Sequence, residues 1–175
     1  MRRRAAQRVA ISILALAVCG VGLAADKLSE LQTRFDHESN AVHKAKLVEK
    51  LGDEEFEEAG QAEQKGDYSR MGLLLEKYRD NVRDASSALL KANPDAVHHP
   101  NGYKQLEMHV QKGLRQLDEF LLEAPDPYKP PLQLVRQDLI AVDNQLLRSL
   151  FPATPLDKTP HHHPSAAPSP AQEVL

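Results

Sequence analysis

The chain lacks most of the residues and motifs that mark a chemically active protein. Its 175 residues include no tryptophan and one cysteine, and aromatic residues make up only 5%. A single cysteine excludes internal disulfides, sites with several thiolate ligands and the Cys-x-x-Cys-His attachment of haem. The chain also has no Gly-x-Ser-x-Gly elbow, His-Glu-x-x-His helix, phosphate-binding glycine loop or paired Glu-x-x-His motif. We therefore expect no catalytic residues, no cofactor and no enzymatic activity.

The N-terminus has the pattern of a secretory signal peptide. Residues 1–8 carry four arginines and no acid, and the apolar run of about fifteen residues that follows is shorter than the ~20 that cross a bilayer. Small residues at the minus-three and minus-one positions favour cleavage after Ala24, whereas cleavage after Ala25 would need the larger Leu23 at minus three. We expect residues 1–25 to be removed and the protein to be periplasmic or secreted, in a bacterium. An alternative is the segment 16–19, Leu-Ala-Val-Cys, which resembles a lipobox and predicts a lipid anchor on Cys19.

Cleavage would leave an acidic chain. All 25 acidic residues remain but only 18 of the 22 basic residues, which changes the net charge from −3 to −7. Phosphate backbones and anionic lipids repel such a chain, so we expect no nucleic-acid partner. The mature chain has no apolar run that predicts a transmembrane span and, without Cys19, no thiol.

Proline groups and apolar periodicity divide the chain into helices. All twelve prolines lie beyond residue 93, where each group marks a helix boundary. Leucine, valine and alanine recur at spacings of three and four over the segments between them. The predicted helices are 26–37, 41–65, 68–92, 100–124 and 131–150. We expect an all-α, antiparallel up-and-down bundle of four to five helices, three of them long, as one domain over 26–151. Residues 152–175, rich in proline, histidine, alanine and serine, are predicted to be a disordered tail.

One segment resembles a known repeat. Ala59, Ala62, the run 66–68 (Gly-Asp-Tyr), Leu75 and Tyr78 stand where a tetratricopeptide repeat has its small residues, its turn and its packing residues. The resemblance covers residues 49–82, and the chain has no second copy of the pattern. It implies a tight antiparallel helix pair and, from the role of that family, protein binding.

Histidines are the candidate metal ligands. His98 and His99 lie in the loop before the fourth helix, and the tail contains a triplet. Neutral imidazoles bind Zn²⁺, Cu²⁺ and Ni²⁺, so the loop pair and the tail triplet could converge on one ion, although adjacent ligands on a flexible chain bind weakly. The alternative is that they are ordinary polar loop residues. The triplet consists of His161, His162 and His163.

Five carboxylates stand within six residues of the second predicted helix, over 53–58. They lack the glycine and carbonyl pattern of a calcium loop, although loose Ca²⁺ or Mg²⁺ binding is an alternative. We expect a solvated acidic face, partly balanced by Lys44, Lys46 and Lys50 one or two turns earlier on the same helix.

These features favour a non-catalytic, exported helical module that binds a protein partner in the cell envelope as a scaffold, adaptor or chaperone-like binder. The alternative function is a periplasmic metal-binding or metal-stress protein that uses the loop and tail histidines.

Overall fold

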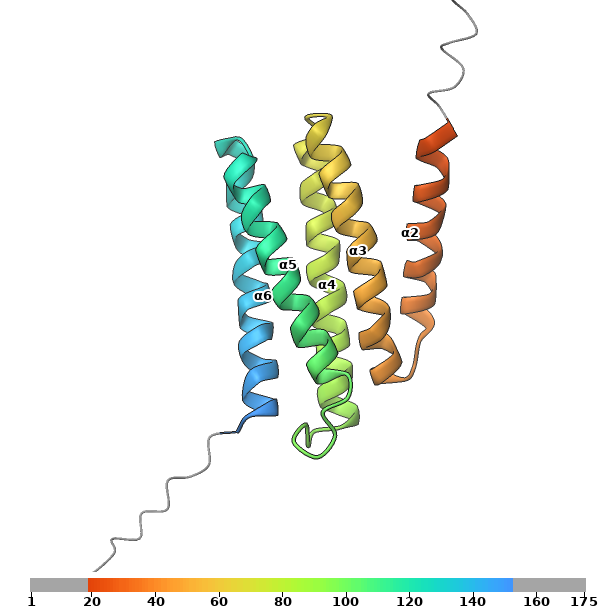
Figure 1. Cartoon of the computed structure of the whole chain (residues 1–175), viewed down its shortest axis with the longest axis vertical. Coiled ribbons are helices and arrows are strands. Elements are labelled where there is room, and N and C mark those ends of the chain that lie inside the picture. The colour runs from red at the N-terminus through yellow and green to blue at the C-terminus, as the bar shows by residue number, and fades with distance from the viewer. Residues whose placement is uncertain (1–18, 153–175) are drawn as a thin grey trace, which may run out of the picture.

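The described part of the chain is a bundle of helices. The computed structural model describes the backbone of residues 19–152 and the side chains from Lys27 onward. Five α-helices run up and down along one axis, a short 3₁₀ helix directly precedes the last of them, and the described residues form no strand (Figure 1). The predicted all-α, antiparallel up-and-down bundle is confirmed. In chain order the elements are α2 (Cys19–His37), α3 (Ala41–Gln64), α4 (Tyr68–Ala92), α5 (Tyr103–Glu123), η1 (Asp126–Tyr128) and α6 (Lys129–Leu150).

Two helical hairpins stack side by side. α3 packs antiparallel against α4, and α5 packs antiparallel against α6. The second hairpin lies on the first so that α5 is beside α3 and α6 is beside α4, which makes these two neighbouring pairs parallel (Figure 1). α2 lies at the opposite edge, antiparallel to α3. The bundle therefore has α2 on one flank of the α3–α4 hairpin and the α5–α6 hairpin on the other.

Local chemistry explains where the second and third predicted helices begin. The Asn40 side chain accepts a hydrogen bond of 3.0 Å from the backbone N–H of His43, and Asp67 accepts one of the same length from Arg70. Each side chain satisfies an amide that has no partner within its own helix. Gly66, at φ +72°, makes the turn between α3 and α4.

Three helix starts differ from the prediction. α5 begins at Tyr103 because Gly102 has a left-handed backbone conformation, φ +86°, which interrupts the helix. α6 begins at Lys129, before the two prolines, since a first-turn proline gives up an amide that needs no helical partner. The described part of α2 extends back to Cys19, before the predicted start at Asp26, so Ala24 and Ala25 lie within the helix.

Parts of the predicted signal peptide and tail lie outside the described residues. Residues 1–18 and 153–175 are not described, and neither are the side chains of 19–26. Signal cleavage, lipidation at Cys19 and disorder of the tail stay predictions. Over the part of the chain that is described, no helix is both long enough and apolar enough to cross a membrane.

The core follows the predicted apolar stripes. Phe35 of α2, Val48 of α3, Leu75 of α4, Leu106 of α5 and Leu139 of α6 are almost completely buried in one continuous apolar cluster. Burial of this area is the main stabilising contribution.

Tyr78 of α4 lies between α3 and α5. Its ring packs edge-on against Phe56 and against the His109 ring. Gly52 on α3 and Gly113 on α5 leave the space that the ring occupies, because a Cβ at either position would lie within 3 Å of Tyr78. The small residues therefore set the spacing between these helices.

Candidate functional site

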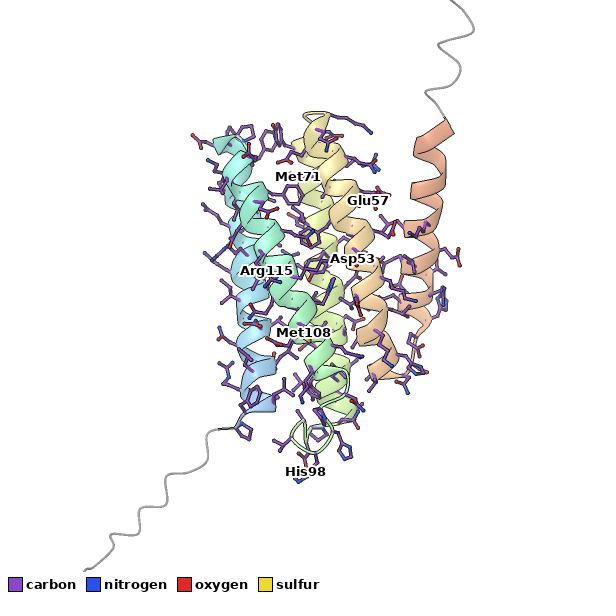
Figure 2. The ribbon with its side chains drawn as sticks, in the orientation of Figure 1. Asp53, Glu57, Met71, His98, Met108 and Arg115 are labelled. Carbon is purple, nitrogen blue, oxygen red and sulfur yellow. The ribbon has the colours of Figure 1, made fainter. Side chains whose placement is uncertain are left out.

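The acidic run on α3 is not a solvated face. Glu55 is 1% exposed and Glu58 is 7% exposed, whereas Asp53 and Glu57 are on the surface (Figure 2). The prediction failed because five carboxylates within six residues of a helix span more than one turn, so some must face the neighbouring helices. Figure 2 shows Asp53 and Glu57 on the ribbon of α3.

The charges on α3 are balanced by other helices and not by its own lysines. Glu54 pairs with Lys27 of α2, Asp53 pairs with Lys112 of α5 at 2.7 Å, and Glu58 pairs with Arg70 of α4 at 2.8 Å. The predicted balance by Lys44, Lys46 and Lys50 is therefore wrong. Lys44 instead reaches Asp84 on α4, at 2.6 Å, and lies over the Phe35 ring. The other two lysines remain available at the surface.

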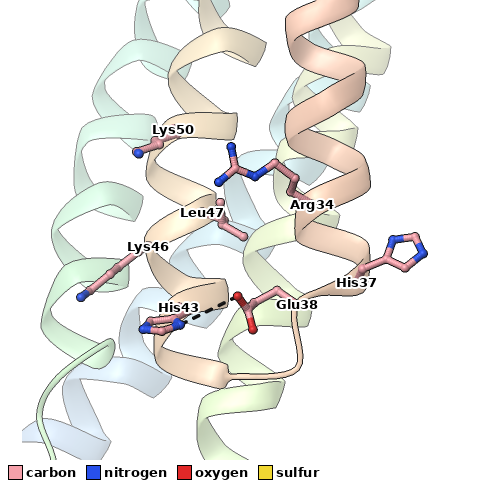
Figure 3. Close-up of a pocket in the computed structure, with 7 residues that line it drawn as sticks. All are labelled: Arg34, His37, Glu38, His43, Lys46, Leu47 and Lys50. Carbon is pink, nitrogen blue, oxygen red and sulfur yellow. Dashed lines mark ion pairs between the residues drawn. The ribbon is translucent and has the colours of Figure 1, made fainter.

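Those lysines line a cleft between α2 and α3, at the end of the bundle where the two helices connect (Figure 3). The cleft encloses about 420 Å³. We call it the basic cleft. In Figure 3 the Arg34 guanidinium points from α2 toward α3, whereas the His37 ring points away from α3. The residues that line it are Arg34, His37, Glu38, His43, Lys46, Leu47 and Lys50.

Positive charge dominates the basic cleft. Within the described residues, Arg34, Lys46 and Lys50 form no ion pair. Its single acid, Glu38, accepts a hydrogen bond of 2.7 Å from the Asn40 N–H and lies 3.9 Å from His43 Nδ1. The Glu38 carboxylate thus contacts residues of the loop and of the start of α3, and it does not pair with Arg34, Lys46 or Lys50. On a chain with a net negative charge, the cleft is a local concentration of positive charge.

A buried polar cluster joins α2, α3 and α4 farther from the loop between α2 and α3. Asn81 exchanges two hydrogen bonds with the Gln32 amide of α2, at 3.1 and 3.2 Å, and donates to Glu55 Oε1 at 2.9 Å. The other carboxyl oxygen of Glu55 is buried without a hydrogen-bond partner. Burial raises the pKa of Glu55 to about 8, against the opposing influence of Lys77 and of the Asn81 hydrogen bond. Glu55 is therefore mostly protonated at neutral pH.

Tyr78 and His109 pack against each other in the core. Both are buried, and the Tyr78 hydroxyl donates a hydrogen bond of 3.3 Å to the His109 backbone carbonyl. Burial raises the pKa of Tyr78 and lowers the pKa of His109, so both side chains stay neutral. The imidazole Nε2 has no hydrogen-bond partner and faces the α3 backbone at Gly52.

The candidate metal ligands are only partly described. His98 is exposed in the loop at the end of the bundle, where its Nδ1 lies 2.7 Å from Asp95 (Figure 2). Among the described residues, no group of three or more histidine, cysteine, aspartate or glutamate side chains is placed to hold a metal ion. His161, His162 and His163 lie outside the described residues, so their convergence with His98 and His99 stays a prediction.

Comparisons with known proteins add no functional assignment. No family model, curated protein or solved structure matches the chain. The α3–α4 hairpin has the tight antiparallel form that the tetratricopeptide resemblance implies, with Gly66 at its turn. The protein binding that the resemblance implies stays a prediction.

The prediction from sequence missed the basic cleft, although the chain holds a signal for it. Residues 39–48 contain His43, Lys44 and Lys46 and no acid. The signal was incomplete because Arg34, the third cation of the cleft, is on α2. It was also misleading, because Lys44 pairs with Asp84 of α4 and does not line the cleft.

Proposed function

We propose that the protein is an exported helical interaction module, without catalytic activity, that binds an acidic segment of a protein partner in the basic cleft. The observation that carries the proposal is the set of cations Arg34, Lys46 and Lys50, which have no acid partner among the described residues of an acidic protein. Export rests on the N-terminal pattern of arginines followed by an apolar run.

The spacing of the cations fits an extended peptide better than a single small anion. Lys46 and Lys50 follow one another along one side of α3, and four residues of helix rise about 6 Å. Alternate side chains of an extended chain are about 7 Å apart, so carboxylates on such a chain can reach successive cations. Leu47, between the lysines, offers apolar contact to the same segment.

Fluorescence anisotropy with a fluorescein-labelled decaglutamate peptide tests the proposal. We expect the wild-type protein to bind it, and the double variant Lys46→Glu/Lys50→Glu to bind about tenfold more weakly, because two attractive contacts become repulsive. The matched control is Lys65→Glu/Arg115→Glu, which changes the net charge equally at two exposed positions outside the cleft. Equal binding by the two double variants would show that the peptide senses net charge and not the cleft.

A further inference from the structure

α2 is held to the bundle by few apolar side chains and by the buried polar cluster. Among its described residues only Leu31 and Phe35 are buried, whereas α3 and α4 each bury a full apolar stripe. Gln32 lies between them in the chain and forms two hydrogen bonds with Asn81, and the Asn81 amide also donates a hydrogen bond to Glu55. The polar cluster is thus part of the surface on which α2 lies.

The geometry points to α2 as a proton-controlled latch: loss of the Glu55 proton releases α2 from the α3–α4 hairpin and so dismantles the basic cleft. This inference rests on the proposed function only for its consequence at the cleft. α2 supplies Arg34, and its C-terminal turn forms one wall, so the cleft requires α2 in its docked position.

The groups around Glu55 do not fully compensate a negative charge on its carboxyl, so the docking of α2 depends on whether Glu55 is protonated. From α4, Lys77 is the charge that acts on the carboxyl, and the Tyr78 phenol, which is neutral, lies on the same helix. α2 contributes the neutral Gln32 amide, and from α5 the neutral His109 packs against the Tyr78 ring. No cation forms an ion pair with Glu55 in the described part of the chain, so its ionised form is a buried, largely uncompensated charge.

Proton linkage gives the size of the effect. A carboxyl with a pKa of about 8 when α2 is docked, and with its ordinary value of 4.5 when exposed, releases a proton when α2 detaches. Detachment then becomes more favourable as pH rises from 4.5 to 8. Between pH 6 and pH 8 the equilibrium constant for detachment increases about 50-fold if exposure is complete.

Hydrogen exchange of the α2 amides, measured by mass spectrometry without any peptide, tests the latch. After correction for intrinsic exchange, we expect protection over residues 28–37 to fall tens of fold in the wild type from pH 6 to pH 8. In Glu55→Gln the fall should be less than threefold, because no carboxyl titrates. Glu57→Gln, an exposed change on the same helix, should behave as the wild type. Glu55→Met is a second variant without the carboxyl, in case the first does not fold.

Two results would overturn the inference: wild-type protection that is as insensitive to pH as that of Glu55→Gln, or an equal loss in both proteins. Because no peptide is present, the outcome does not depend on whether the cleft binds an acidic segment. Anisotropy with decaglutamate at pH 8 addresses that separately, and there we expect Glu55→Gln to bind more tightly than the wild type. If neither protein binds the peptide while exchange follows the expected pattern, the proposed function fails and the latch stands.

Discussion

The glycines of α3, α4 and α5 allow the close approach of these helices to be tested by substitution with alanine. At Gly52 the new methyl group would lie 2.7 Å from Tyr78 Cε2 and would also contact His109 Nε2. At Gly113 it would lie 2.5 Å from the Tyr78 hydroxyl. Gly60 and Gly72 are also within helices but have no atom within 4 Å of an added Cβ. The four positions differ mainly in the space beside them.

The expected changes have opposite signs. Alanine in place of glycine within a helix stabilises by roughly 0.5–1 kcal/mol, which is the full effect expected for Gly60→Ala and Gly72→Ala. At Gly52 and Gly113 the methyl group must displace a completely buried tyrosine ring, and overpacking of this kind costs about 1–3 kcal/mol or more. We expect each of these two variants to be less stable than the wild type by about 2 kcal/mol.

Urea denaturation followed by far-ultraviolet circular dichroism measures these differences, since the helices provide a strong signal and the described residues contain no other regular structure. The informative comparison is Gly52→Ala with Gly60→Ala, because both lie on α3. If the two variants had the same free energy of unfolding, the idea that the space beside Gly52 is needed for the Tyr78 ring would be refuted.

Two further predictions concern stability. The wild type should lose stability as pH rises from about 4.5 toward 8, because the folded state keeps the Glu55 proton that the unfolded chain releases. Glu55→Gln has no carboxyl to titrate, so it should lack this loss and be more stable than the wild type at pH 7 by about 1–3 kcal/mol. Denaturation at pH 5 and pH 7 measures it, and parallel pH profiles of the two proteins would contradict it. Asn40→Ala and Asp67→Ala each remove a helix cap and should cost about 1 kcal/mol, whereas Asp67→Asn should cost little; a loss equal to that of Asp67→Ala would argue against capping.

The elements of the fold were largely predictable from sequence. α4 has the predicted bounds, because Asp67 caps its start and Asn93 with the following proline ends it. The apolar spacing predicted which side of each long helix is buried, since that pattern depends only on the helical period. The 3₁₀ helix η1 and the early start of α6 were missed, because two prolines within a first turn can stand inside a helix as well as before it.

The functional residues were less predictable. Glu55 and Lys44 belong to runs of like charge, which resemble a solvated helix face. Whether such a side chain is buried, paired across helices or free depends on which neighbour faces it, and that requires the arrangement of the helices.

The number of helices and their apolar faces could therefore be predicted from the sequence alone, because each depends on residues within a few positions of one another. It also contains the charge imbalance and the N-terminal pattern from which export is predicted. Three features depend on the arrangement of the helices: α5 lies beside α3, the buried Glu55 is linked to α2 through Asn81, and Arg34 lines the same cleft as two lysines. These contacts join residues far apart in the chain, so they are set by the packing of whole helices and not by local spacing.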